Sequence, residues 1–185
     1  MSSTDSEFKI VFTGPMGAGK TTAIAAISDE APVSTDVFNT DREAFDKALT
    51  TAGLDYGQIA LEDGATVRLY GTPGQARFRF MWDILGLNAA GVIVLIDAAQ
   101  PDAQVQLDHF VDAFGSGRRV PIVVGVGRLE HPGAPPLDVF AQRLETRGLT
   151  LPVFGVDVRR RPDVLLLLDT LLCLLETADP TRLTA

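Results

Sequence analysis

Residues 14 to 21 carry the pattern with the clearest chemical meaning in this chain. They read Gly-Pro-Met-Gly-Ala-Gly-Lys-Thr and match the phosphate-binding pattern G-x-x-x-x-G-K-[ST], the P-loop, at every fixed position. Glycines let such a loop bend until its backbone N–H groups face phosphate oxygens. A lysine adds positive charge, and a hydroxyl oxygen suits Mg²⁺. The pattern therefore predicts a site for a nucleoside triphosphate with Mg²⁺.

The loop residues have separate predicted roles. Lys20 is expected to reach the outer phosphates, and the Thr21 hydroxyl is expected to ligate Mg²⁺. The other residues of the loop and its exit are expected to surround the phosphates: Gly14, Pro15, Met16, Gly17, Ala18, Gly19 and Thr22. The alternative is a glycine-rich turn that binds nothing, and the flanking sequence argues against it.

The segments on either side supply the strand and the helix that a P-loop needs. Residues 8 to 12 form a short apolar run suited to a buried strand, and residues 21 to 28 are a plausible helix start rich in alanine. The start of that helix would add a partial positive charge beside the phosphates. Strand, loop and helix thus follow in the required order.

The rest of the chain alternates between predicted strands and helices. Glu62-Asp63-Gly64 lies between two strand-like runs, which favours a hairpin and one antiparallel edge strand. The predicted strands cover residues 54–61, 65–70, 90–96, 120–126 and 151–156, and the predicted helices 80–88, 102–114, 136–147 and 162–177. This alternation predicts an α/β fold, the doubly wound P-loop fold, with about six strands in a mostly parallel sheet. Residues 31 to 53 predict a long loop, with room for a short helix near 41 to 49.

Composition narrows the classes of partner. A length of 185 residues fits a single domain, 1–185, and the net charge of −8 argues against a nucleic-acid or anionic-membrane surface. The start of the chain lacks a secretory pattern, and no apolar run reaches the roughly 20 residues needed to cross a bilayer. We expect a cytoplasmic protein without a direct membrane anchor. Cys173, in a leucine-rich segment, is expected to be buried.

Further motifs, in matching order, resemble those of the Ras-like small GTPases. Gly71-Thr72-Pro73-Gly74-Gln75, followed by Ala76-Arg77-Phe78, looks like the Asp-Thr-Ala-Gly-Gln-Glu-Arg-Phe of that family's second switch. Thr51-Ala52-Gly53-Leu54-Asp55-Tyr56 looks like the Thr-Ile-Gly-Val-Asp-Phe that ends the first switch in Rab-type members. The resemblance spans residues 8 to 177. It is closest to the bacterial branch encoded beside Roadblock-fold regulators, related to the gliding-motility GTPase.

The resemblance implies roles for residues outside the P-loop. The Thr51 hydroxyl would complete the Mg²⁺ shell, with Thr50 as the neighbouring alternative. The Gly74 N–H would contact the γ-phosphate, and the Gln75 amide would orient an attacking water. Gln75 and Lys20 are therefore the predicted catalytic residues. The same resemblance implies a Roadblock-fold regulator and an effector protein that the sequence does not identify.

One departure from the family pattern concerns the metal. Gly71 stands where most relatives have an aspartate that holds Mg²⁺ at the end of its strand. The resemblance therefore implies weaker metal binding in this chain. Asp36 or Asp41, in the long loop, are alternative acidic groups for that role.

A second departure concerns the base. Family members read guanine with Asn-Lys-x-Asp, and the corresponding run here is Gly127-Arg128-Leu129-Glu130. Glu130 keeps a carboxylate for the base, one methylene further out, and Arg128 can cover the base face as lysine does. The expected ligand is GTP or GDP, and ATP stays open.

These features together predict a nucleotide-dependent switch that binds GTP with Mg²⁺ and hydrolyses it slowly in regulatory signalling. Gly71 and the altered base motif leave open a pseudo-GTPase or an ATP-binding interaction module that does not hydrolyse. A small-molecule P-loop kinase is less favoured because the chain has no lid-like insertion. The side chains of Phe78, Phe80, Met81 and Trp82 fit either a protein contact or core packing.

Overall fold

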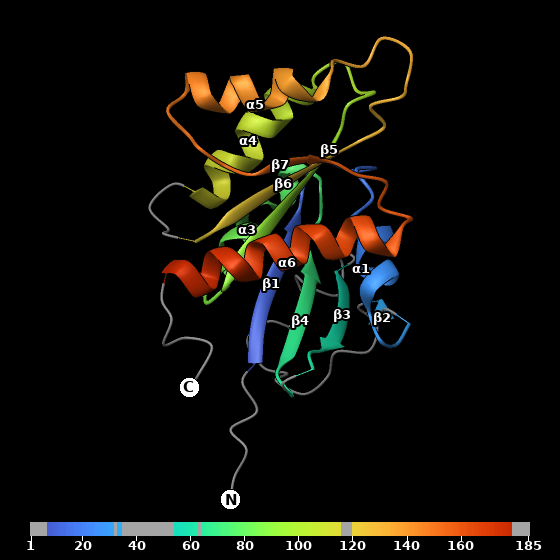
Figure 1. Ribbon diagram of the computed structural model, residues 1–185, viewed down its shortest axis with the longest axis vertical. Helices are drawn as coiled ribbons and strands as arrows, with labels where there is room; N and C mark the ends of the chain where they lie inside the picture. The colour runs from blue at the N-terminus through green and yellow to red at the C-terminus, as the bar shows by residue number, and fades with distance from the viewer. Residues whose placement is uncertain (1–6, 32, 35–53, 63, 116–119, 179–185) are drawn as a thin grey trace, which may run out of the picture.

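The sheet runs through the centre of the molecule in the strand order β2-β3-β4-β1-β5-β6-β7 (Figure 1). The structure, a computed structural model, describes residues 7–31, 33–34, 54–62, 64–115 and 120–178. Within these ranges the strands are β1 (Glu7–Thr13), β2 (Val33–Ser34), β3 (Asp55–Ala60), β4 (Thr66–Gly71), β5 (Gly91–Asp97), β6 (Ile122–Gly127) and β7 (Val153–Gly155). Neighbouring strands are parallel except that β3 is antiparallel to both β2 and β4.

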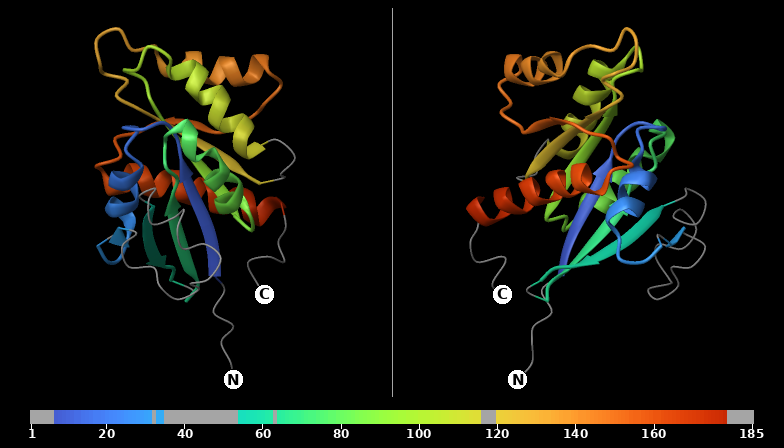
Figure 2. Two further views of the ribbon diagram at one scale, coloured as in Figure 1. Left: turned by 180° about the vertical axis from the view of Figure 1, so that it is seen from behind. Right: turned by 45° about the vertical axis from the view of Figure 1, so that its right-hand side comes forward.

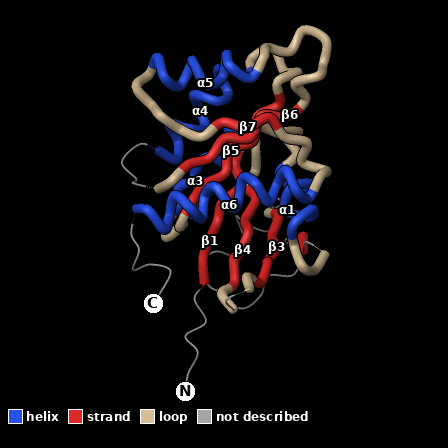
Figure 3. The backbone as a smooth tube through the Cα atoms, in the orientation of Figure 1, coloured by secondary structure: helices blue, strands red, loops and turns tan. Residues whose placement is uncertain are grey.

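Helices cover both faces of the sheet. They are α1 (Lys20–Ile27), α3 (Arg79–Gly86), α4 (Ala103–Gly115), α5 (Leu137–Thr146) and α6 (Arg161–Ala178), with a 3₁₀ turn η2 (Ala76–Phe78). Figure 3 shows α1 and α6 lying across the strands on one face. The view from behind in Figure 2 shows α3 and α4 on the other face. The predicted α/β fold class is confirmed.

Strand β5 illustrates why the central strands read as continuous apolar runs. All seven of its residues are buried, because helices cover the sheet on both sides. Val92, Val94 and Ile96 face the cluster beneath α3 and α4, whereas Ile93 and Leu95 face the cluster beneath α1 and α6. Alternate side chains of a strand point to opposite faces. Burial of each such aliphatic side chain stabilises the folded state by about 1.5 to 3 kcal/mol.

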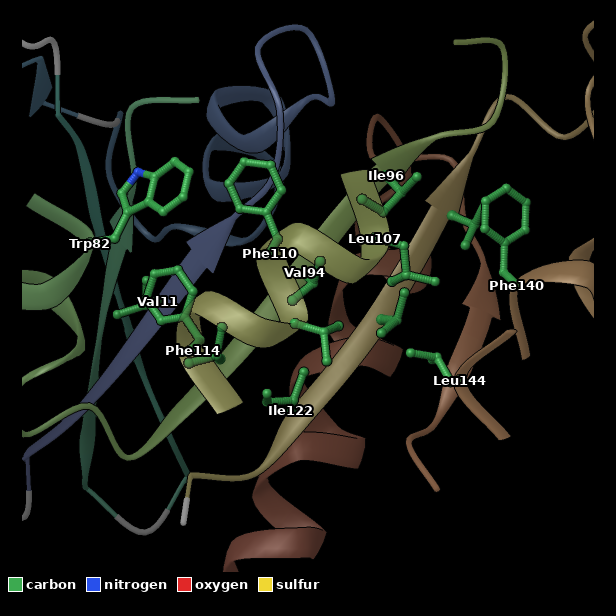
Figure 4. Close-up of a cluster of buried hydrophobic side chains, with 14 of the residues drawn as sticks. Val11, Trp82, Val94, Ile96, Leu107, Phe110, Phe114, Ile122, Phe140 and Leu144 are labelled. Atoms are coloured by element: carbon green, nitrogen blue, oxygen red, sulfur yellow. The ribbon is translucent and has the colours of Figure 1, made fainter. Parts of the chain in front are cut away.

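Aromatic packing between α3 and α4 fixes the segment that precedes α3. The Trp82 ring lies 4.7 Å from the Phe110 ring, centroid to centroid, and Figure 4 shows both in the cluster with Phe114. The Trp82 indole N–H also donates a 2.8 Å hydrogen bond to the Pro73 carbonyl. The core therefore holds one end of residues 72 to 75, which line the site described below.

The structure differs from the sequence predictions in two respects. Strand β2 was not predicted, since two residues give no periodic pattern, and it places β3 second from the sheet edge. The predicted burial of Cys173 is wrong: the thiol is exposed. Helix α6 buries a stripe of residues three or four apart, Val164, Leu167, Leu168, Leu171 and Leu175, and Cys173 lies outside it. The helix considered near 41 to 49 lies outside the described residues.

The strand order brings one set of strand ends together. After β1 the chain builds β3 and β4 on one side of it and β5 on the other, so the carboxyl end of β1 opens into a crevice. Thr13, Gly71, Asp97 and Gly127 end parallel strands at this edge. Asp55 begins β3 at the same edge, because β3 runs the opposite way. Among the described helices, none is long and apolar enough to cross a membrane.

Candidate functional site

The P-loop connects β1 to α1 in a conformation that depends on glycine. Gly14 has φ 143°, and a Cβ there would lie 2.1 Å from the Leu95 carbonyl oxygen of β5. Gly19 has φ 91°, and a Cβ there would lie 2.7 Å from Val158. Any side chain at either position would collide with its neighbour. The α1 N-terminus has no side-chain cap, so its first N–H groups remain available to an anion.

Lys20 is held inside this loop. It is the first residue of α1 and is 8% exposed. Its ammonium donates hydrogen bonds of 2.8 Å to the carbonyl oxygens of Gly14 and Pro15. Burial lowers the pKa of Lys20 to about 8, and the negative charge of Asp55 opposes that shift. The loop thus presents a desolvated cation, which an anionic phosphate would stabilise.

The Thr21 hydroxyl points at a carboxylate. Its Oγ1 donates a 2.5 Å hydrogen bond to Oδ2 of Asp55, at the start of β3. Gly71 lies directly opposite Asp55 on β4. A hydroxyl oxygen and a carboxylate oxygen so close together are the hard ligands that Mg²⁺ prefers. The chemistry of this pair therefore fits a divalent cation.

The segment after β4 packs against the P-loop. The Thr72 N–H donates to the Phe12 carbonyl at 2.9 Å, which extends the pairing of β4 with β1. A Cβ at Gly74 would lie 2.3 Å from the Met16 amide nitrogen, so only glycine allows this approach. The Gln75 amide nitrogen donates to Sδ of Met16 at 3.6 Å.

Several of these residues line one cavity of about 410 Å³ beside the P-loop. The cavity is lined by Met16, Gly17, Gly19, Lys20, Thr21, Thr22, Asp55, Thr72, Pro73, Gly74, Gln75 and Phe78. It gathers the predicted lysine, hydroxyl, glycine and glutamine into one space. We call it the phosphate cavity.

A second cavity of about 620 Å³ lies on the other side of the P-loop. Its walls are residues 17 to 19 of the P-loop, 127 to 130 after β6, and 155 to 159 around the end of β7. Arg128 and Glu130, which the resemblance assigns to the base, are among these residues, and both are exposed. We call this space the base cavity.

Ion pairs shape the wall of the base cavity. The Arg128 guanidinium donates to Oδ2 of Asp97 at 3.0 Å, and Asp97 is 5% exposed at the end of β5. Asp97 also accepts from the Ala99 N–H at 3.0 Å, so its position is fixed. On the opposite wall, hydrogen bonds from Arg159 lower the pKa of Asp157 to about 2. Both carboxylates are therefore already engaged by arginine.

Comparison with known proteins adds an independent observation. Translation initiation factor IF-2 of Magnetococcus marinus is 29% identical over 148 residues, which are 80% of this chain and 14% of that factor. ADP-ribosylation factor-like protein 8b of Arabidopsis thaliana is 24% identical over 147 residues, covering 78% of this chain and 73% of the relative. The IF-2 of Caulobacter vibrioides is 26% identical over 180 residues, 92% of this chain and 16% of that factor.

These similarities support a place in the P-loop GTPase superfamily. No family model matches the chain. The Roadblock-associated branch stays a prediction, since none of these relatives bears on it. The two cavities adjoin each other, because both are lined by Gly17, Gly19 and Thr22.

The predicted site residues do not all lie around one cavity. Those that line the phosphate cavity are Met16, Gly17, Gly19, Lys20, Thr21, Thr22, Gly74 and Gln75. Ala18, Arg128 and Glu130 line the base cavity, and Gly14 and Pro15 provide the carbonyl oxygens that accept from Lys20. Thr51 lies outside the described residues, as do Thr50, Asp36 and Asp41. Sequence reasoning gave no role to Asp55 or Asp97. Both lie at strand ends on the edge that carries the P-loop, a placement that depends on the strand order and on the antiparallel direction of β3.

Proposed function

We propose that the protein is a GTP-binding switch that hydrolyses GTP slowly with Mg²⁺ and acts in regulatory signalling. One observation carries the proposal: the buried Lys20 ammonium and the Thr21 hydroxyl open onto the same phosphate cavity, beside the uncapped start of α1. The similarity to P-loop GTPases supports guanine nucleotide as the ligand.

At the phosphate end, the chain provides charge and backbone donors. An ammonium has three protons, and two of those of Lys20 are committed to the Gly14 and Pro15 carbonyls. The third is left for an oxygen of the β- or γ-phosphate. The negative ligand would raise the lowered pKa of Lys20, so binding and protonation of this group reinforce each other.

The Thr21 and Thr51 hydroxyls are the predicted protein ligands of Mg²⁺. When bound, Mg²⁺ would neutralise charge on the β- and γ-phosphate oxygens. Thr21 is oriented for this by the hydrogen bond that its hydroxyl donates to Asp55, which leaves the lone pairs of the hydroxyl oxygen for the metal. Thr51, at the end of the first switch, would be drawn in only in the triphosphate state.

Hydrolysis requires that Gln75 turns away from Met16. Its amide now contacts the Met16 sulfur, at the rim of the phosphate cavity. Turned inward, it can accept a hydrogen bond from a water and donate one to it. Among the described residues that line the phosphate cavity there is no arginine. Turnover should therefore be slow, and an arginine from a partner would raise it by about 10³ to 10⁵.

At the base end, Glu130 is the proposed reader of guanine and Arg128 the proposed cover of its face. A carboxylate can accept from the ring N–H and the exocyclic amine of guanine, whereas adenine offers no such pair. A bidentate contact of this kind gives about 1 to 3 kcal/mol of discrimination. ATP is thus the weaker ligand in this proposal.

Regulation by protein partners is part of the proposal. Phe80 of α3 is 48% exposed beside the second switch, whereas Met81 and Trp82 of the same helix are buried. An exposed aromatic at this place suits contact with a Roadblock-fold regulator or an effector. A second candidate is a pseudo-GTPase that binds without hydrolysis, favoured by Gly71 and the altered base motif. Phosphate release measured with and without a regulator separates the two.

Amide hydrogen exchange tests the switch directly. Residues 32 to 53 and 72 to 82 should exchange more slowly with a non-hydrolysable GTP analogue than with GDP, because Thr51 and Gly74 would contact the γ-phosphate. Helix α6 serves as the internal control and should exchange equally in both states. Equal exchange in the two switch segments would contradict a switch and leave a static binding protein.

A further inference from the structure

Gly71 lacks the carboxylate that the resemblance places at this position of the metal site. The neighbouring strand β3 has a carboxylate, Asp55, directly opposite Gly71. We propose that Asp55 supplies, from the start of β3, the acidic group of the metal site that residue 71 cannot provide. This inference rests on the proposed nucleotide function and concerns the same site.

The sheet register puts the two residues side by side. Asp55 is the first residue of β3 and Gly71 the last residue of β4, and they are direct partners in the antiparallel pair. Directly opposed residues have Cβ atoms about 4.5 to 5.5 Å apart and project to the same face. A carboxylate can therefore be exchanged between these two positions without leaving the site.

The space beside Gly71 is filled by the Asp55 side chain. A Cβ placed on Gly71 would lie 3.0 Å from Cβ of Asp55 and 3.1 Å from its Oδ2. Cδ1 of Ile24, from α1, would also lie 3.1 Å from it. An aspartate at position 71 and the present Asp55 would compete for one volume and repel each other. The absence of a side chain at residue 71 thus allows Asp55 to adopt its position.

The carboxylate of Asp55 is directed into the phosphate cavity. Its Oδ2 accepts the 2.5 Å hydrogen bond from Thr21, the predicted metal ligand. Asp55 also lines this cavity together with Lys20, Gly74 and Gln75. A cation held by the Thr21 hydroxyl would therefore meet the Asp55 carboxylate at once. Carboxylates that complete a metal's surroundings commonly change metal affinity by about 10- to 100-fold.

The test measures how much Mg²⁺ tightens nucleotide binding. Fluorescent GDP is titrated into the full chain in excess Mg²⁺ and in excess EDTA, and the ratio of the two affinities is the readout. Asp55→Ala should lower this ratio by about 10-fold or more while affinity in EDTA stays near that of the wild type. Asp169→Asn, an exposed carboxylate on α6, is the matched control and should leave the ratio unchanged.

A double variant separates a metal role from a structural one. Asp55→Gly combined with Gly71→Asp returns the carboxylate to the neighbouring strand and should restore most of the Mg²⁺ dependence lost in Asp55→Ala. The spectrum of bound Mn²⁺, measured by electron paramagnetic resonance with GDP, should change in Asp55→Ala and return in the double variant.

The outcomes distinguish this inference from the proposed function. A wild-type Mg²⁺ ratio in Asp55→Ala would overturn the inference, as would a folded double variant that binds GDP in EDTA but gains nothing from Mg²⁺. Wild-type protein that binds GDP equally in Mg²⁺ and EDTA would overturn the inference and leave nucleotide binding in place. Wild-type protein that binds no nucleotide would overturn both.

Discussion

The phosphate cavity and the base cavity, the proposed phosphate end and base end of the site, differ in the kinds of group that line them. At the phosphate end, backbone conformation decides the geometry: Gly14, Gly19 and Gly74 stand where a side chain would collide, and Lys20 is buried. At the base end, the predicted contacts come from exposed side chains on a loop, Arg128 and Glu130. Phosphates are common to all nucleotides, whereas the base differs. In the proposed function, the part that all nucleotides share would therefore meet the part of the site fixed by close backbone contacts.

The difference also affects how substitutions act. A change in the phosphate end must preserve the loop conformation, so a lost group has to be replaced from nearby, as Asp55 is placed to do for Gly71. A change in the base end alters only which side chains face the base cavity. The chain can therefore keep a complete P-loop while its base motif departs from Asn-Lys-x-Asp.

The phosphate end should be the easier one to destroy. Lys20→Ala removes a buried charge that would pair with phosphate, a loss of about 2 to 5 kcal/mol, or roughly 30- to 5,000-fold in affinity. GTP, GDP, ATP and ADP should all be affected, because the lysine does not contact the base. Titration of fluorescent nucleotides measures this, with circular dichroism as the check on folding. Unchanged nucleotide affinity in Lys20→Ala would contradict phosphate binding by the P-loop.

Burial of Lys20 should also cost stability in the nucleotide-free protein. Its pKa is lowered to about 8, so below pH 8 the folded state holds a charged group that the unfolded chain solvates better. Lys20→Met should be more stable than the wild type at pH 7, by up to about 3 kcal/mol.

The difference in stability between the wild type and Lys20→Met should depend on pH. Between pH 8 and 10.5 the unfolded wild type binds a proton at Lys20 that the folded state has released, so wild-type stability rises relative to the variant. The gap between the two proteins should narrow across this window. Urea unfolding at several pH values measures it, and a gap independent of pH would contradict a desolvated ammonium.

The base end should respond selectively. Glu130→Ala should weaken GTP binding by about 1 to 3 kcal/mol and leave ATP binding nearly unchanged, since only guanine offers the paired donors. ITP, which lacks the exocyclic amine, is the ligand control and should lose less than GTP. Equal losses for GTP and ATP would mean that Glu130 does not read the base.

Substitution of Gln75 should have the smallest effect, a change in the rate of hydrolysis without a change in GTP affinity. Gln75→Leu should bind GTP as the wild type does but hydrolyse it about tenfold more slowly, the effect of losing about 1.4 kcal/mol of transition-state stabilisation. Single-turnover phosphate release with and without a regulator is the measurement. A normal rate in both conditions would exclude Gln75 from the mechanism.

The sequence predicts the fold and the strand, loop and helix around residues 14 to 21 for physical reasons. The run around β5 is continuously apolar because both faces are covered, and the glycines of the P-loop are required by close contacts with Leu95 and Val158. Such requirements leave a visible mark on residue type. The predicted parallel strands and the order of helices followed from the same patterns.

Residues whose role depends on neighbours in the sheet were beyond sequence reasoning. Asp55 lies at the start of a predicted strand, where acidic residues are commonly solvated, and its register with Gly71 brings it to Thr21. Asp97 likewise accepts a hydrogen bond from Arg128, which is distant in sequence. The burial of Trp82 beside the exposed Phe80 depends on how α3 packs against α4. Each case needs a long-range pairing that no local pattern contains.

Calorimetric titration of the wild-type protein with GTP and with ATP, each in excess Mg²⁺, tests the central claim most directly. Both nucleotides should bind, because they share the phosphates, and GTP should bind about tenfold tighter or more, because Glu130 would read guanine. Binding of neither nucleotide would contradict the phosphate site, and ATP binding as tightly as GTP would contradict a guanine-nucleotide switch.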